Sequence, residues 1–413
     1  MRDVLPSEIP AWERLEAVAR ELARLFGCRE IRPPLLEEAE LFIRSVGEVT
    51  DIVEKEMFVL HKGETSLALR PEATAGIVRA YLQAGFAQQA PVQKLFTIGP
   101  MFRYERPQKA RERQFTQFDV ELLGSLDPRL DAEAIHMAAR FFEELGLAGL
   151  EVRMNSMGDG DDRDRYREAV RAFVEPQLAE RCELCRERFA RNVLRVLDCK
   201  NEACRRLNQG APRLIDFLSE ENRAHFARVR SHLADLGRAT VVDPAIVRGL
   251  DYYTRTVFEL HHPPLGARSA LCGGGRYDHL VRDLGGPDLG AVGFAIGFTP
   301  TLIALEELGL VAGLAPRPAD AYLVAADPSL AGEVLRLAGE LRSVGISAVY
   351  DSEQRSLKAQ MKAANAGGHP LALILGPDEL RAGTVQLKRM ASGEQAAVPR
   401  AELAVRARAA LGK

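Results

Sequence analysis

The sequence predicts an α+β core built on an antiparallel sheet and interrupted by a helical insertion, followed by a smaller α/β domain. Alternating side chains in residues 114–123 indicate a strand with one apolar face and one polar face. Residues 158–238 are dense in charge and helical in period, so we expect the insertion there. Beyond residue 320, strand-like and helical segments alternate, which is typical of a small sheet covered by helices.

The chain has 413 residues, enough for two or three domains at about 100–200 residues each. Apolar residues make up 46% and charged residues 27%, a balance that excludes collagen-like, coiled-coil and largely disordered chains. The 55 Lys and Arg residues nearly balance the 58 Asp and Glu residues. Any contact with nucleic acid must therefore come from a local basic patch.

The N-terminal segment carries charges and has no apolar core, so no secretory signal is expected. The longest uncharged run, residues 289–305, contains helix-breaking Gly and Pro residues, and a buried strand leading into a helix fits it better than a membrane span. We therefore expect a cytoplasmic protein with no membrane contact. Its six cysteines are then expected to be free thiols or metal ligands.

The core begins with a helix at residues 11–26, where apolar residues recur at three- and four-residue steps before Gly27. Residues 41–56 are less regular. Extended and helical segments follow, with strands expected at residues 66–69, 92–104 and 114–123 and a helix at residues 131–145. After the insertion, strands are expected at residues 239–242 and 256–260, before a glycine-rich stretch at residues 273–297.

A linker rich in Gly and Pro at residues 309–320 separates the second domain, so we expect domains at residues 1–312 and 319–413. In the second domain, Ser356 is placed to cap a helix that begins at Leu357. The other expected elements are strands at residues 322–324, 346–350, 371–375 and 384–389, a helix at residues 329–344 and a last helix at the end.

The most informative segment is a hairpin at residues 99–123. Its polar front carries Arg103 and Glu105 on the first strand and Arg113, Gln117 and Glu121 on the second. Its tip is basic, with Arg106, Lys109, Arg111 and Arg113. Fixed arginines on such a front suit a small polar zwitterion beside a phosphate. A solvated sheet face with a charged turn fits the pattern equally well.

Two further segments carry unusual composition: residues 248–254 (RGLDYYT) and residues 272–278 (CGGGRYD). Three consecutive glycines let the backbone approach a ligand or another strand closely. A glycine triplet alone more often marks a loop, and this one lacks the Gly-Lys-Ser/Thr ending of a Walker A phosphate loop.

Together these segments resemble one family, the histidyl-tRNA synthetases, which are class II aminoacyl-tRNA synthetases. The likeness covers nearly the whole chain and includes the dimer-forming first motif, residues 31–35 through 47–51, and the second motif in the hairpin. Residues 248–254 and 270–278 resemble the two histidine-specific signatures of the family. The C-terminal module resembles its anticodon-binding domain, and the core is expected to be class II synthetase-like.

The resemblance implies a histidine–tRNA ligase, an ATP-dependent enzyme of protein biosynthesis. It would activate L-histidine with ATP and Mg²⁺ to histidyl-adenylate and transfer the amino acid to tRNA(His), as a homodimer. An alternative is a catalytically impaired paralogue that binds histidine as a regulatory subunit, such as the one attached to short-form ATP phosphoribosyltransferase.

The resemblance also implies which residues hold the amino acid. Those that match the histidine site are Glu72, Thr74, Gln117, Glu121, Tyr252, Tyr253 and Tyr277. The first three match contacts to the amino end, and Glu121 and Tyr277 match the groups that recognise imidazole. A carboxylate and a phenol accept and orient imidazole N–H groups, and most apolar amino acids would leave them unpaired.

For ATP, the residues that the resemblance implies are Arg103, Glu105, Arg113 and Arg248. Arg103 matches the arginine on the α-phosphate, and Arg248 matches the arginine with the catalytic electrostatic role. Two preorganised guanidinium groups and Mg²⁺ would stabilise the charge that spreads over the phosphoryl oxygens in the transition state.

The third motif departs from the family pattern. Its helix usually opens with Glu-Arg, but here Thr299 and Pro300 follow the strand at residues 293–298. We expect Thr299 as the N-cap and Pro300 at the first helical position. The missing cation favours the regulatory alternative. The retained histidine residues, both arginines and the anticodon-like module favour the ligase.

Four cysteines fall in the insertion, in the spacing Cys182-x2-Cys185-x13-Cys199-x4-Cys204. Four thiolates so spaced could hold a structural Zn²⁺ ion. Because this insertion varies within the family, cysteines at these positions need not bind metal, and the site prediction includes no metal. Cys28 and Cys272 are expected to be small buried residues.

Overall fold

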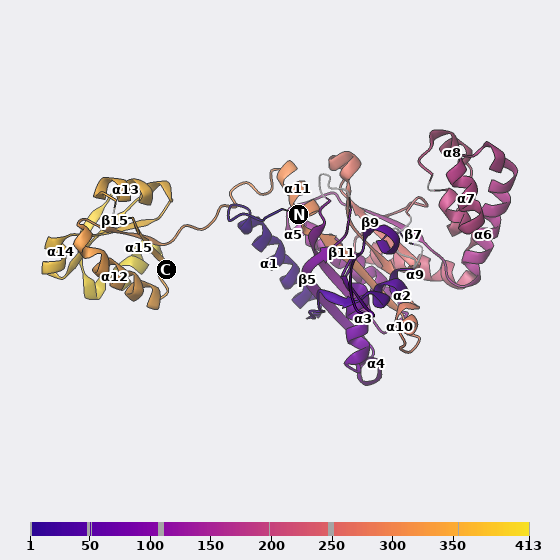
Figure 1. Cartoon of the computed structure of the whole chain (residues 1–413), viewed down its shortest axis with the longest axis horizontal. Helices are drawn as coiled ribbons and strands as arrows, with labels where there is room; N and C mark the ends of the chain where they lie inside the picture. The colour runs from indigo at the N-terminus through magenta and orange to yellow at the C-terminus, as the bar shows by residue number, and fades with distance from the viewer. Residues whose placement is uncertain are drawn as a thin grey trace. The chain divides into compact units, whose positions relative to one another are not determined.

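The computed structural model describes residues 2–47, 50, 52–105, 111–197, 199–246, 252–353 and 355–412. The chain forms two compact units, Met1–Leu314 and Ala315–Lys413 (Figure 1). Each unit has a hydrophobic core of its own. Among the helices that these residues form, none combines the length and the apolar character that a membrane crossing requires.

The first unit is built on a sheet with the strand order β1-β5-β6-β11-β10-β9-β7-β8. Its inner strands pair antiparallel, and only the edge pairs β1–β5 and β7–β8 run parallel among the described strands. The strands are β1 (Arg29–Glu30), β5 (Gln93–Phe102), β6 (Gln114–Leu123), β7 (Glu151–Ser156), β8 (Thr240–Val242), β9 (Thr254–His261), β10 (Ala270–Arg276) and β11 (Ala291–Gly297). The predicted antiparallel core is confirmed.

The apolar back of this sheet packs on helix α5 (Pro128–Glu144), which contacts β6, β9, β10 and β11. The back face of β6 supplies Phe118, whose ring centroid lies 5.8 Å from that of Phe141 on α5 and 5.9 Å from that of Phe294 on β11. Asp127 starts α5 by accepting a hydrogen bond from Arg129 N (2.9 Å). The remaining helices near the sheet are α1 (Ile9–Leu25), α9 (Glu220–Asp235), α10 (Leu280–Asp283) and α11 (Phe298–Glu307).

A small antiparallel sheet with the order β2-β4-β3 lies between α1 and the hairpin in the sequence. Its strand β3 is missing from the sequence prediction, because its outer residues are polar and exposed and show no alternation. The elements of this region are β2 (Leu36–Glu38), α2 (Ala39–Val46), β3 (Phe58–Lys62), β4 (Thr65–Leu69), α3 (Thr74–Gln83) and α4 (Phe86–Gln89).

The charged stretch that was expected to form an insertion is helical. Helices α6 (Asp161–Val174), α7 (Glu183–Arg191) and α8 (Glu202–Leu207) gather into a bundle with a small core of its own (Figure 1). Helix α9 instead packs against α5, and its buried Phe226, Val229 and Leu233 belong to the main core. The separate bundle is therefore shorter than the charged stretch.

The second unit has the strand order β13-β12-β14-β15-β16, parallel for the first three strands and antiparallel for the rest. As expected, Ser356 caps α13, since its hydroxyl accepts a hydrogen bond from Ala359 N (3.4 Å). The elements are β12 (Ala321–Ala325), α12 (Ala331–Ser343), β13 (Ala348–Tyr350), α13 (Leu357–Ala366), β14 (Leu371–Leu375), α14 (Pro377–Ala382), β15 (Thr384–Arg389), β16 (Gln395–Pro399) and α15 (Leu403–Leu411).

Candidate active site

The polar front of the main sheet is centred on strand β6. Because side chains alternate along a strand, Gln117, Asp119 and Glu121 all point to the face opposite Phe118 and Val120. Asp119 and Glu121 are only 2% exposed. Ionisable groups so deeply buried need partners, and partners from other elements surround them.

Glu121 joins two elements that are distant in sequence. Its Oε1 accepts a hydrogen bond from the hydroxyl of Thr74 (2.6 Å), the first residue of α3. Its Oε2 accepts a hydrogen bond from the hydroxyl of Tyr277, the residue after β10. The backbone N–H of Tyr277 in turn donates to Ala291 O on β11 (2.8 Å). The structure therefore brings Glu121, Thr74 and Tyr277 into one hydrogen-bonded group.

Gly293 leaves the space that the Glu121 carboxylate occupies. The two residues face each other across the β6–β11 pair. A Cβ at position 293 would overlap Glu121 Oε2 and lie 2.5 Å from Val120 O. Position 293 thus requires glycine because a side chain there would occupy the space of the Glu121 carboxylate. The backbone angle at this position is not one that favours glycine.

We expect the substitution Gly293→Ala to destabilise the protein by about 2–3 kcal/mol, because the new methyl group meets a backbone oxygen that cannot move away. It should also displace Glu121 and weaken ligand binding at this site. Urea unfolding and calorimetric titration measure the two effects. The control is Gly332→Ala in α12, where a Cβ meets no atom within 4 Å and a gain of about 0.5–1 kcal/mol is expected. Equal stability changes in the two variants would contradict the role of Gly293.

Three tyrosines form one wall of the site. The ring centroids of Tyr252 and Tyr253 are 4.8 Å apart, and Tyr277 lies 5.4 Å from Tyr252 and 6.5 Å from Tyr253. The glycines of β10 allow this packing, since a Cβ at Gly275 would lie 2.9 Å from the ring of Tyr253. The glycine triplet is therefore part of a central strand, and the loop interpretation is wrong.

Glu72 is the third buried carboxyl group of the site. Its two oxygens accept hydrogen bonds from the backbone N–H groups of Thr74 (2.7 Å) and Ala75 (2.9 Å), at the N-terminus of α3. These bonds favour the ionised form, but burial outweighs them and raises the pKa of Glu72.

The same physics applies to the carboxyls of β6. Burial raises the pKa of Asp119 to about 8, with a further increase from the neighbouring Glu72. Burial also raises the pKa of Glu121 well above its usual value, against the effect of the Thr74 hydrogen bond. Three carboxyl groups close together thus disfavour full ionisation, and a cationic ligand would relieve this repulsion.

Cations near the carboxyls are few among the described residues. The guanidinium of Arg70 donates hydrogen bonds to two backbone oxygens, Pro100 O and Pro33 O, both at 2.9 Å. Arg103 donates to Pro71 O (2.9 Å), and its positive charge lowers the pKa values of Glu72 and Asp119. The positive charge of Arg70 also lowers the pKa of Asp119, so two arginines lie near the buried carboxyl groups.

On the polar face of β6, two buried oxygen atoms have no hydrogen-bond partner among the described residues: Gln117 Oε1 and Asp119 Oδ2. An unpaired buried acceptor costs about 1–3 kcal/mol, so such atoms mark places where a ligand donates. Both atoms belong to the same face of β6 as Glu121. An ammonium group with its three N–H donors matches this need.

Asp119 was not among the residues assigned to the site from the sequence, although it shares the alternation of Gln117 and Glu121. We expect Asp119→Asn to be more stable than the wild type, by an amount that grows as the pH rises from about 4 to about 8. In the folded protein the Asp119 carboxyl keeps its proton up to pH about 8, whereas the unfolded chain releases it near pH 4. Folding is therefore penalised increasingly over this window, and an amide escapes the penalty.

The expected gain in the free energy of unfolding is about 2–4 kcal/mol at pH 8 and near zero at pH 4. Urea unfolding without ligand at both pH values measures it. The control is Asp288→Asn, whose side chain is 71% exposed and should show little change. A gain that is the same at both pH values would show that the Asp119 carboxyl is not responsible.

The residues assigned to ATP from the sequence are only partly described. The guanidinium of Arg113 stacks 4.1 Å from the ring centroid of Tyr104, and Glu105 forms an ion pair with Arg111 (3.3 Å). Arg248, together with Arg106 and Lys109 of the hairpin tip, lies outside the described residues.

The start of α11 differs from the sequence expectation. The helix begins at Phe298 with Gly297 as its N-cap, so Thr299 is not the cap and Pro300 is the third helical residue. The Thr299 hydroxyl donates instead to Glu112 Oε2 (3.0 Å), and Glu112 also binds Arg2 Nε (2.9 Å). The expected cap is wrong because this carboxylate takes the hydroxyl group.

Comparison with known proteins extends these observations to the whole chain. A family model described as histidyl-tRNA synthetase matches residues 1–300, and one described as anticodon binding domain matches residues 320–409. The chain is 47% identical to a histidine–tRNA ligase of Anaeromyxobacter dehalogenans, over 98% of the chain and 97% of the relative. It is 46% identical to a histidine–tRNA ligase of Cyanothece sp., over 97% and 93%. The crystal structure of apo S. aureus histidyl-tRNA synthetase superposes with a TM-score of 0.82 at 35% identity, over 98% of this chain and 97% of that one.

Proposed function

The chain belongs to the histidyl-tRNA synthetase family, and from this premise we propose that it is a histidine–tRNA ligase. The observation that carries the proposal is the hydrogen-bonded group of Glu121, Thr74 and Tyr277 beside the buried carboxyl groups of Glu72 and Asp119. Histidine is a ligand with an N–H donor on its ring and an ammonium group at the other end. The side chains of the site offer acceptors for both.

We assign the imidazole to Glu121 and Tyr277. A carboxylate that accepts from one ring N–H and a phenol that contacts the other nitrogen fix the ring orientation. The wall of Tyr252 and Tyr253 packs against the ring faces. An amino acid of similar size without a ring N–H group would not supply the donor that the buried Glu121 carboxylate accepts from imidazole, which is the basis of strong discrimination.

We assign the α-ammonium group to Glu72, Thr74 and Gln117, and we add Asp119 to this set. The unpaired oxygens of Gln117 and Asp119 are the acceptors that such a group requires. When the ammonium binds, its charge should lower the pKa of Asp119 and ionise the carboxyl. Binding and deprotonation of the site are then linked.

The reaction proceeds in two transfers. A histidine carboxylate oxygen bonds to the α-phosphorus of ATP, and the bond to pyrophosphate breaks, which gives histidyl-adenylate. A ribose hydroxyl of the 3′-terminal nucleotide of tRNA then attacks the adenylate carbonyl, and AMP leaves. In the first transfer Arg103 and Arg248 would stabilise the developing charge on the phosphoryl oxygens. Arg113 and Glu105 would contact ATP, and the Glu105 carboxylate offers oxygen of the kind that Mg²⁺ prefers.

We further propose that residues 1–312 carry out catalysis, that residues 319–413 contact the anticodon of tRNA(His), and that the enzyme works in the cytoplasm as a homodimer. The match of residues 320–409 to an anticodon-binding family supports the second assignment. Exposed Leu35, Leu36 and Leu60 around the small sheet support a self-association surface. Light scattering should then give twice the chain mass of 45.5 kDa.

Aminoacylation of a tRNA(His) transcript with labelled histidine tests the proposed function. Charging that depends on ATP and on the protein is expected. Histidine binding by the folded protein with no charging, at any ATP concentration, would instead support the regulatory alternative. The Thr299-Pro300 sequence is the one observation that favours this alternative.

The substitution Pro300→Arg measures what the third-motif change costs. A guanidinium at this position of α11 should lower the ATP KM by about tenfold, the usual worth of one charged hydrogen bond to a phosphate. Pyrophosphate exchange as a function of ATP concentration measures the effect. Pro300→Ala, which removes the proline ring without adding charge, is the matched control. The same KM in both variants would show that the missing cation has no role.

A further inference from the structure

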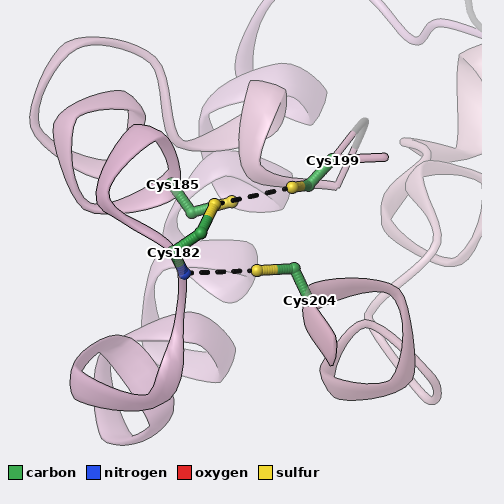
Figure 2. A group of neighbouring side chains, drawn as sticks. All are labelled: Cys182, Cys185, Cys199 and Cys204. Carbon is green, nitrogen blue, oxygen red and sulfur yellow. Dashed lines mark hydrogen bonds between the residues drawn. The ribbon is translucent and has the colours of Figure 1, made fainter. Parts of the chain in front are cut away.

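The four cysteines of the insertion converge on one point. Cys182 precedes helix α7, Cys185 lies in its first turn, Cys199 lies between α7 and α8, and Cys204 lies in α8. Their sulfur atoms all lie within 4.8 Å of one another, and the Sγ atoms of Cys182 and Cys199 are 3.8 Å apart. In Figure 2 the side chains reach inward from separate segments toward a common centre.

This spacing fits a single tetrahedral metal ion. Four sulfurs bound to Zn²⁺ at about 2.3 Å occupy a tetrahedron whose edges are about 3.8 Å long. A disulfide would instead bring one pair to about 2.05 Å. We propose that Cys182, Cys185, Cys199 and Cys204 bind one zinc ion in a structural site. The proposal does not depend on the ligase function, because these residues lie outside the candidate active site.

The backbone around the cysteines holds them in ligand geometry. Cys182 O accepts hydrogen bonds from the N–H groups of Cys185 (3.0 Å) and Arg186 (3.2 Å), which turns both thiols of the Cys-x2-Cys segment inward. The N–H of Cys182 points to Cys204 Sγ (3.3 Å), as outer-shell donors do toward metal-bound thiolates. Asn201 caps α8 by accepting from Ala203 N and Cys204 N, and so fixes the fourth ligand.

The charge of the surroundings points the same way. Zinc with four thiolates carries a net charge of −2, and burial of such a group requires nearby cations. Arg181, adjacent to Cys182 in the chain, is 2% exposed and forms no ion pair with a carboxylate among the described residues. It donates to Asn208 Oδ1 (2.6 Å) and Leu207 O. A buried guanidinium without an anion is costly unless the zinc–thiolate group supplies the charge.

The site is closed, as structural zinc sites are. All four ligands come from the protein, and Cys185, Cys199 and Cys204 are buried. The bundle around them has short helices and a core in which these thiols pack with four valines, Val170, Val174, Val193 and Val196. A core this small gives little stability by itself, and a metal that links α7 to α8 would supply the rest. On binding, each thiol releases its proton and contributes a thiolate, with no change in oxidation state.

Metal analysis of the full-length protein tests the proposal. The untagged chain is produced in zinc-supplemented minimal medium and purified under reducing conditions. Elemental analysis should find about one zinc ion per chain, and X-ray absorption should show a pure sulfur shell at about 2.3 Å. Protein that stays metal-free after incubation with Zn²⁺, protein that contains iron instead, or an intact mass lowered by two disulfides would each overturn the proposal.

The variant Cys199→Ser should bind zinc more than about 100-fold more weakly. This loss is expected to be larger than the one caused by changing a residue that only contacts a ligand, because a ligand itself is lost. The control is Cys28→Ala, which removes an equally buried thiol of the main core and should keep its zinc. If Cys199→Ser does not fold, zinc is removed from the wild type with a mercurial and a chelator, and limited proteolysis is followed. Cleavage that increases within residues 161–207 on zinc loss supports the site. Full zinc content in folded Cys199→Ser, or an unchanged cleavage pattern in zinc-stripped wild type, would contradict it.

Discussion

The substitution Glu121→Gln is expected to lower kcat/KM for histidine in pyrophosphate exchange by about 10³–10⁴-fold. This is the cost of losing the acceptor for the imidazole N–H in a site that is built to recognise it. The amide has the shape of the carboxylate but no charge, and it turns one of the two acceptors into a donor. Tyr277 and Thr74 both donate to this side chain, and the imidazole N–H needs an acceptor there as well. The variant should fold, since the substitution removes a buried ionisable group.

Two measurements separate this effect from a general disturbance. Urea unfolding should show a stability equal to or above that of the wild type, because burial disfavours the Glu121 carboxylate. The control Glu151→Gln changes a carboxylate on β7 of the same sheet, whose side chain is 40% exposed, and should leave exchange unchanged. If Glu121→Gln loses less than about tenfold in kcat/KM, Glu121 does not recognise the ring.

The substitution Arg248→Ala should reduce pyrophosphate exchange by about 10³–10⁵-fold, the range for an arginine that stabilises a phosphoryl transition state. No general base is needed in this step, because the histidine carboxylate is already a nucleophile. Catalysis then depends on positive charge held near the phosphoryl oxygens. A methyl group in place of the guanidinium leaves the negative charge on these oxygens unbalanced. The fall should appear in kcat more than in the KM for histidine.

Arg238→Ala is a suitable control. This arginine forms a partly exposed ion pair with Glu143 of α5, so the variant tests the loss of a guanidinium outside the candidate active site. Circular dichroism and histidine binding should be unchanged in Arg248→Ala. Exchange at near wild-type rates by Arg248→Ala would show that Arg248 has no electrostatic role. Arg103 would then be the charge that stabilises the transition state.

Local patterns in the sequence predict much of the fold. Strand β6 has the predicted bounds because its alternation is regular over ten residues. The same alternation places Gln117 and Glu121 on the polar front. Strands β3 and β16 were missed because they are short and largely exposed, and their apolar residues do not alternate. The helical start at Thr299 was wrong because its hydroxyl group binds Glu112, a residue 187 positions away.

The chemistry of the site depends on contacts that no local pattern contains. Glu121 meets Thr74 across 47 residues and Tyr277 across 156. The pairing of the strands and the position of the start of α3 bring these three residues together. Asp119 follows the same period as Gln117, and its position was open to prediction. Its raised pKa was not, since that comes from its burial and from the neighbouring Glu72. Gly293 is likewise explained only by the carboxylate that faces it.

The most direct test is pyrophosphate exchange by the wild-type protein with each of the twenty amino acids in turn. The arrangement of Glu121, Tyr277 and the buried carboxyl groups of Glu72 and Asp119 predicts saturable exchange with histidine and only background with the other nineteen. No exchange with histidine from well-folded protein at saturating ATP would contradict the account. So would comparable exchange with an amino acid whose side chain has no N–H donor.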